Sequence, residues 1–151
     1  MNPLKSFEEF EKAMIVKKVA PNISRANSLI HESKKRKKFI KEMKEKIGVT
    51  DENADYYIEN VYDTIMALIR AKMFLRGFRA SGNGVHEAEV SYTRKLKFTE
   101  QETRFLNEIR YWRNQIVYYG KELTKKYAQK VILFMEKICS KEIFRQLYLQ
   151  E

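Results

Sequence analysis

The chain has very little cysteine, proline or glycine. Its 151 residues include one Cys, two Pro and five Gly. A single cysteine excludes an internal disulfide. Cys139 falls among the apolar residues of a predicted helix, so we expect a buried thiol in a reducing compartment. So few turn-forming residues leave little material for a many-stranded fold, which needs frequent tight turns. The composition therefore favours helices.

Long hydrophobic runs and metal-binding motifs are also missing. No apolar run approaches the roughly 20 residues that span a bilayer. Residues 1–11 carry acids and no apolar stretch, so we expect no secretory signal. His31 and His86 are far apart and have no metal-ligand spacing with Cys139. The sequence thus predicts a cytoplasmic protein with no membrane partner, no metal and no cofactor.

Positive charge is what the chain has in excess. Thirty Lys and Arg stand against twenty Asp and Glu, which gives a net charge of +10. A surface this basic attracts polyanions such as nucleic acids. Interspersed glutamates also allow a simple solvated helix face, because lysine-rich faces are common. The densest basic run consists of Lys34, Lys35, Arg36, Lys37 and Lys38.

Hydrophobic periodicity predicts an all-α fold, an antiparallel up-and-down bundle of about five helices. We expect a single domain over residues 1–151, with an N-terminal arm (1–21), a bundle (22–140) and a C-terminal tail (141–151). The tail is expected to pack back or to meet another subunit. In the arm, one apolar side is predicted from Phe7, Phe10, Met14 and Ile15.

Caps and glycines give approximate bounds for the helices. The helices are expected to begin near Asn22 or Ser24, at Thr50 or Asp51, near His86, at Thr99 and near Leu123. Thr99 with Glu102 forms a predicted capping box. The expected ends are Gly48, Gly77, Lys97, Tyr119 and Ile138. The glycine-containing segment 78–84 is interpreted as a helix–helix connection rather than a phosphate-binding loop.

The helix expected to end near Tyr119 carries an Arg-Asn pair beside its apolar stripe. A buried unpaired guanidinium costs several kcal/mol, so Arg113 needs a carboxylate, a phosphate or another polar partner. The residue types fit an interhelical Arg–carboxylate bridge and a functional phosphate site equally well. The predicted buried stripe, at 4-3-4-3 spacing, consists of Phe105, Ile109, Trp112, Ile116 and Tyr119.

The order of these motifs resembles the HEPN superfamily of prokaryotic helical-bundle proteins, which are often paired with a minimal nucleotidyltransferase. Arg113 and Asn114 match the family's Arg-Asn pair, and Ile116 fits its apolar third position. The segments 15–21 and 73–88 look like the opening and the second-helix end and loop of one branch. The resemblance implies a dimer whose paired motifs face each other across a cleft.

Many members of this superfamily are metal-independent RNases, in which a motif histidine transfers protons and the arginine stabilises phosphate charge. Here Tyr118 and Tyr119 stand where that histidine would be. A phenol, with an ordinary pKa of about 10, is a poor general base near neutral pH. We therefore expect a homodimeric RNA- or nucleotide-binding module, or the partner of a minimal nucleotidyltransferase in a toxin–antitoxin type pair, without RNase activity. The alternative is a metal-independent endoribonuclease toxin with a variant motif.

The candidate site residues follow from the resemblance and the charge. Arg113 is expected to grip phosphate, Asn114 to orient it, and Tyr118 to stack on a base or donate a hydrogen bond. The same three are the candidates for any catalysis. Arg79 and the basic run at residues 34–38 complete the expected nucleic-acid surface. His86 is expected to cap or pack at the start of its helix, unless the adjoining loop folds toward the cleft.

Overall fold

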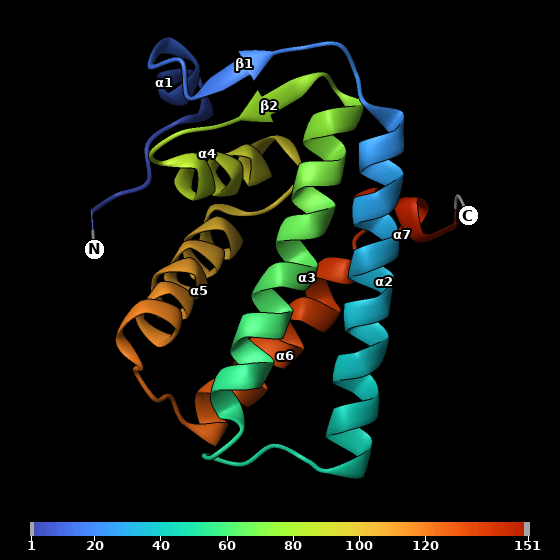
Figure 1. Cartoon of the computed structure of the whole chain (residues 1–151), viewed down its shortest axis with the longest axis vertical. Coiled ribbons are helices and arrows are strands. Elements are labelled where there is room, and N and C mark those ends of the chain that lie inside the picture. Colours follow the sequence, from blue (N-terminus) through green and yellow to red (C-terminus); the bar gives the residue numbers. More distant parts are fainter. Residues whose placement is uncertain (1, 150–151) are drawn as a thin grey trace.

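The computed structural model describes residues 2–149, and this part of the chain is all-α apart from one two-stranded sheet. Four long helices run alternately down and up (Figure 1). Helices α2 and α5 flank α3, and α6 passes behind them. The predicted all-α antiparallel bundle is confirmed. The long helices are α2 (Ile23–Lys46), α3 (Ala54–Leu75), α5 (Glu100–Tyr119) and α6 (Lys125–Cys139).

Shorter helices lie near the two ends of the chain and between α3 and α5. Helix α1 (Phe7–Lys12) lies in the arm, and α7 (Glu142–Leu149) follows α6. Phe144 and Leu147 of α7 are buried, so the tail packs back onto its own bundle. Helix α4 (Val85–Ser91) continues as a 3₁₀-helix (Tyr92–Lys95). The α-helix expected from His86 to Lys97 therefore ends earlier, at Ser91.

The arm and the segment after α3 form a sheet that the sequence interpretation missed. Strand β1 (Val16–Lys18) pairs antiparallel with β2 (Phe78–Ala80). The segment 78–84 is therefore not only a helix–helix connection. Gly77 makes the entry to β2 possible: its φ is +78°, and a Cβ there would lie 2.6 Å from the Val19 carbonyl oxygen. No side chain fits at that position.

Side-chain caps mark where α2, α5 and α6 begin. The Asn22 side chain accepts a hydrogen bond from the Arg25 N–H at the start of α2, and both halves of the Thr99–Glu102 capping box are present. Helix α3 begins later than expected, at Ala54. Thr50 and Asn53 instead exchange side chain–backbone hydrogen bonds of 2.8 and 3.1 Å in a turn before it.

The buried face of α5 differs in part from the predicted stripe. Ile109 and Ile116 are buried as expected, whereas Trp112 is half-buried and Tyr119 is 77% exposed. The buried face of α5 centres on Leu106 and Ile109. Trp112 and Tyr119 therefore lie at its edge and are open to solvent. In the arm, Met14 is likewise exposed rather than apolar core, because its positive φ of 62° turns the chain after α1.

Candidate nucleic-acid interface

Arg113 lies between α5 and α3 and is held by groups of its own chain. Its guanidinium is 3.7 Å from the Asp63 carboxylate and 5.6 Å from the centre of the Tyr62 ring. The side chain is 23% exposed. Burial raises the pKa of Glu59, and the positive charge of Arg113 partly offsets that rise. The structure therefore contains the interhelical Arg–carboxylate bridge, one of the two interpretations of this residue.

The two other motif residues are not tied to a partner. Asn114 is half-buried, and its side chain forms no hydrogen bond with any of residues 2–149. Tyr118 is 68% exposed and makes no ring or hydrogen-bond contact within the same range. The three residues follow one another on the last turns of α5, and none of them lines the lysine groove between α2, α6 and α7. Only Arg113 points into the bundle.

The residues of the basic run 34–38 do not all lie on the same side of α2. Arg36 faces α3: its guanidinium donates to the Asn60 side chain at 3.0 Å and lies 3.8 Å from Asp63. Asp63 therefore sits between Arg36 and Arg113. Lys35 is exposed on another side. The remaining lysines of the run face away from α3.

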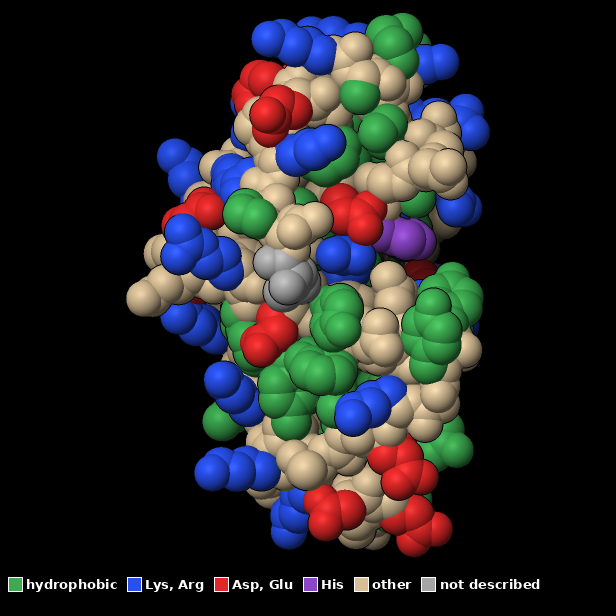
Figure 2. All heavy atoms as spheres, turned by 90° about the vertical axis from the view of Figure 1, so that its left-hand side faces the viewer, with side chains coloured by type: hydrophobic (Ala, Val, Ile, Leu, Met, Phe, Trp, Pro, Cys, Tyr) green, Lys and Arg blue, Asp and Glu red, His purple; other side chains and the backbone are tan. Residues whose placement is uncertain are grey.

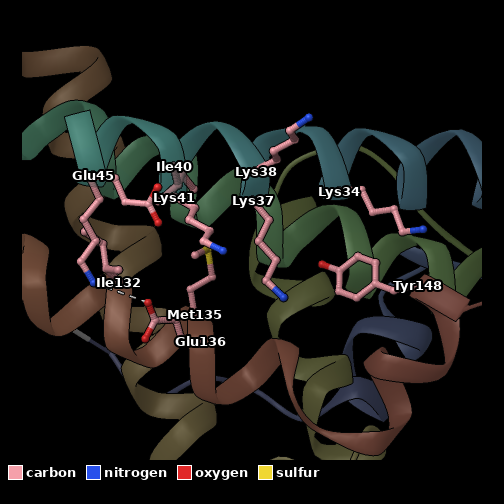
Figure 3. A pocket seen from close by; sticks show the side chains of 11 residues that line it. Lys34, Lys37, Lys38, Ile40, Lys41, Glu45, Ile132, Met135, Glu136 and Tyr148 are labelled. Carbon is pink, nitrogen blue, oxygen red and sulfur yellow. Dashed lines mark ion pairs between the residues drawn. The ribbon is translucent and has the colours of Figure 1, made fainter. Parts of the chain in front are cut away.

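Those remaining lysines line a groove between α2, α6 and α7, with a volume of about 680 Å³. Figure 3 shows Lys37 and Lys41 extending from α2 toward α6 and α7, and Lys38 projecting from the rim. Their spacing of three or four residues puts them on one side of the helix. No residue of α5 lines this groove. Its lysines are Lys34, Lys37, Lys38, Lys41 and Lys44.

Few negative charges offset these lysines. Glu45 and Glu136 are the carboxylates among the lining residues, and Glu136 lies 3.6 Å from the Lys44 ammonium. The Lys37 ammonium stands 5.1 Å from the centre of the Tyr148 ring. Within residues 2–149, Lys37, Lys38 and Lys41 form no ion pair. The groove is thus a concave surface with a net positive charge.

The Tyr148 ring lines the groove at α7, and contacts of its hydroxyl group hold it in place. Its hydroxyl lies 2.9 Å from the Ser33 hydroxyl and 3.7 Å from the Cys139 sulfur. Burial raises the pKa of Tyr148 and of the Cys139 thiol above their ordinary values. Both groups are therefore neutral near pH 7, and Cys139 is buried as expected. Neither adds negative charge to the groove.

A second polar cluster lies between α3, α4 and α5, and the sequence interpretation did not find it. Arg70 donates to the Glu89 carboxylate at 2.8 Å, and Arg110 lies 2.9 Å from Glu87. Burial alone would lower the pKa of Arg70, but the charge and hydrogen bond of Glu89 raise it overall. The partners of each pair lie on different helices and far apart in the sequence, so no local sequence pattern predicts the pairs.

His86 and Arg79 belong to the same end of the molecule. His86 packs at the start of α4, as expected, with its Nδ1 3.5 Å from a Glu89 carboxylate oxygen. Arg79 is exposed on β2 and lines a different pocket from the lysines. The residues predicted to form one nucleic-acid surface are therefore distributed over three separate places.

Comparison with protein-family models, with curated proteins and with solved structures finds no match to this chain. The HEPN resemblance consequently stays a prediction from sequence motifs. Residues 2–149 contain no group of three or more His, Cys, Asp or Glu placed to hold a metal ion. In the same range, no helix has both the length and the apolarity to cross a membrane.

Proposed function

We propose that this protein binds RNA through its sugar–phosphate backbone, along the lysine groove between α2, α6 and α7. The observation that supports this most is the row of five lysines on one side of α2, three of which have no carboxylate partner within residues 2–149. Ammonium groups without a carboxylate partner are available to bind phosphates and to release the counterions condensed on a nucleic acid. Phosphate contacts of this kind position the ligand without reading its sequence.

The dimensions of the row suit a polymer rather than a single anion. Ten residues separate Lys34 from Lys44, which corresponds to roughly 15 Å along a helix axis. Several consecutive phosphates of one strand occupy such a length. The net charge of +10 adds long-range attraction that steers a polyanion to the surface.

In this proposal, Arg113 stabilises the fold and contributes little to RNA binding. Its guanidinium already contacts Asp63 and Tyr62, and leaving that arrangement would unpair Asp63 in part. The motif position also lacks an imidazole, so we propose a binding protein without ribonuclease activity. Incubation of a long single-stranded RNA with highly purified protein in EDTA should leave the RNA intact. Cleavage that Arg113→Ala abolishes would support the alternative, a HEPN-type endoribonuclease.

We further propose that the protein forms a homodimer through the outer face of α5. Figure 2 shows hydrophobic side chains gathered on the side of the molecule where α5 lies. On that helix, Tyr111, Val117, Tyr118 and Tyr119 are all more than a third exposed. Aromatic residues are enriched at protein interfaces.

Light scattering tests the dimer. It should give twice the 18.1 kDa mass of one chain at micromolar concentration, and Tyr118→Ser with Tyr119→Ser should shift the mass toward one chain. A monomeric wild type would overturn the homodimer. The α5 face would then be assigned to another protein, and the HEPN resemblance names a minimal nucleotidyltransferase as the candidate.

Two triple variants with equal charge test RNA binding. The groove variant carries Lys37→Gln, Lys38→Gln and Lys41→Gln. The control variant carries Lys12→Gln, Lys121→Gln and Lys126→Gln, at three exposed positions outside the groove. Each variant has a net charge of +7, because three positive charges are removed from +10. Fluorescence anisotropy with a short single-stranded RNA, between 50 and 200 mM salt, measures affinity and its salt dependence.

We expect the groove variant to bind much more weakly than the control variant. Each lost phosphate contact lowers the log–log salt slope by about 0.7 for a single strand, so three contacts lower it by about 2. The control should change affinity only through its smaller net charge. Equal losses in the two variants would mean that the groove is not the binding surface. Wild-type binding that is absent at 50 mM salt would remove RNA altogether.

A further inference from the structure

A pocket of about 390 Å³ opens at the end of the bundle that carries the sheet. The start of α2, the end of α3, strand β2 and helix α4 surround it. Its apolar wall comes from Met73, Phe74 and Phe78. It shares no lining residue with the lysine groove, so its function does not depend on RNA binding there. The polar residues around it are Arg25, Arg70, Arg79, His86 and Glu89.

Two arginines at the mouth of this pocket have no counter-charge. Arg25 and Arg79 are exposed, and within residues 2–149 neither forms an ion pair or a side-chain hydrogen bond. Lys17 lies directly opposite Arg79 in the register of the sheet. Like charges directly opposite one another destabilise a strand pair. A bound anion would relieve this repulsion.

The same two arginines also line a neighbouring pocket of about 490 Å³, together with Phe74, Val19 and Asn22. The two arginines therefore lie between the two pockets, and an anion in either pocket can contact them. A guanidinium presents a planar fork of donors that matches phosphate oxygens. Two unpaired guanidinium groups on one rim suit a phosphate group better than a single carboxylate.

The interior of the first pocket holds a buried acceptor that lacks a donor. The Glu89 side chain is 7% exposed, and its Oε2 accepts a hydrogen bond from Arg70. Its Oε1 has no hydrogen-bond partner within the described chain, and the His86 Nδ1 stays 3.5 Å away. A buried polar atom without a hydrogen-bond partner destabilises the folded protein. A ligand that donates an N–H or O–H to this oxygen would remove that cost.

We propose that this pocket binds a nucleoside monophosphate. Arg25 and Arg79 bind the phosphate at the mouth, and an exocyclic amino group or ring N–H of the base donates to Glu89 Oε1 inside. The apolar wall of Met73, Phe74 and Phe78 contacts the base. The volume lies within the range of small-molecule sites. Each of the four bases carries an N–H donor, but at a different place on its ring, so the fixed position of Glu89 Oε1 should favour some bases over others.

Isothermal titration calorimetry of the full chain tests this with the four ribonucleoside monophosphates, the four nucleosides and inorganic phosphate. At least one monophosphate should bind more tightly than its own nucleoside and more tightly than inorganic phosphate. Arg25→Gln with Arg79→Gln should weaken that binding at least about tenfold, since charge-assisted hydrogen bonds are lost. Both residues are exposed and unpaired, so the fold should stay intact in circular dichroism.

Two further variants separate the parts of the site. Glu89→Gln keeps the shape of the side chain and changes its hydrogen bonding, so it should change the order of preference among the four monophosphates. The groove variant with Lys37→Gln, Lys38→Gln and Lys41→Gln should bind the monophosphates as the wild type does. The proposal is overturned if no monophosphate binds, if the double arginine variant binds unchanged, or if inorganic phosphate binds as tightly as every monophosphate.

Discussion

Two regions of this molecule that carry several Arg or Lys residues use their positive charges in opposite ways. Between α3, α4 and α5, the guanidinium groups of Arg70, Arg110 and Arg113 contact the carboxylates of Glu89, Glu87 and Asp63. Along α2, five lysines line an open groove, and Lys37, Lys38 and Lys41 among them form no ion pair within residues 2–149. In the first region the positive charges pair with carboxylates and so join the helices. In the second region the positive charges face solvent.

The difference teaches that a count of basic residues does not locate a binding surface. Arg36 and Lys37 are neighbours in the densest basic run, yet one is bonded to Asn60 of α3 and the other faces the groove. Arg is suited to bidentate, partly buried pairs, whereas Lys is a strongly hydrated point charge. The partner of each charge, rather than its position in the sequence, decides whether it is available.

The largest expected effect comes from breaking a buried pair. Arg70→Met leaves the Glu89 carboxylate buried without its guanidinium, which should lower the free energy of unfolding by about 3 kcal/mol. Urea unfolding followed by circular dichroism measures the loss. The control Lys38→Met, in the groove, should stay within about 0.5 kcal/mol of wild type. A loss for Arg70→Met as small as that for Lys38→Met would mean that the Arg70–Glu89 pair does not stabilise the fold.

Glu102 offers a second test of the difference between paired and unpaired charges, because the lysines near it pair with its carboxylate. Its carboxylate lies 2.9 Å from Lys141 and accepts the Thr99 N–H of the capping box. Burial alone would raise the pKa of Glu102, but these bonds lower it overall. Glu102→Gln should therefore cost about 2 kcal/mol near pH 7.

The pH dependence gives the sign of this effect. A carboxylate whose pKa is lowered by folding stabilises the protein above its unfolded pKa of about 4.3, and loses that contribution as the pH falls through the folded value. The difference between wild type and Glu102→Gln in urea unfolding should thus shrink below about pH 4. A difference that is constant from pH 7 to pH 3 would contradict the assignment to the ionised carboxylate.

Arg113 should matter less to stability and hardly at all to RNA. Its contact with Asp63 is long, 3.7 Å, and partly exposed, so Arg113→Met should cost about 1 kcal/mol. RNA affinity in the anisotropy assay should fall less than twofold beyond the effect of one lost charge. A loss as large as that of the groove variant would place the binding surface at α5, as the HEPN resemblance implies.

The smallest expected effect is a gain. Glu136→Gln removes the carboxylate that lies 3.6 Å from the ammonium of the groove lysine Lys44. The freed ammonium should raise RNA affinity about twofold, which corresponds to roughly 0.4 kcal/mol. Glu122→Gln, an exposed change of the same charge outside the groove, is the control. An equal gain in the control would assign the effect to net charge alone.

Much of the fold could be predicted from the sequence because its signals are local. The amphipathic periods of α2, α3, α5 and α6, and caps such as Thr99, lie within a few residues of the structure they specify. The sheet could not be predicted, because three-residue strands show no period and β1 pairs with a segment far along the chain. Tyr119 was expected to be buried and is exposed, since period alone does not give the centre of a buried face.

The candidate site could be predicted only in part. The spacing of Lys34, Lys37 and Lys41 on one side of a helix was a readable signal for a basic face. The groove itself needed the position of α6 and α7, which no motif encodes. The partners of Arg113 and Arg70 lie on other helices, so the sequence shows that each needs a carboxylate but not which one it meets.

Lysine footprinting of the wild type tests most directly whether the groove is the RNA-binding surface. An amine-reactive reagent modifies exposed lysines, and mass spectrometry measures each rate with and without a short single-stranded RNA. We expect RNA to slow modification of Lys38 and Lys41 in the groove and to leave Lys12, Lys121 and Lys126 unchanged, since these lie outside it. Equal protection of all five lysines, or protection of the outer three alone, would contradict the account.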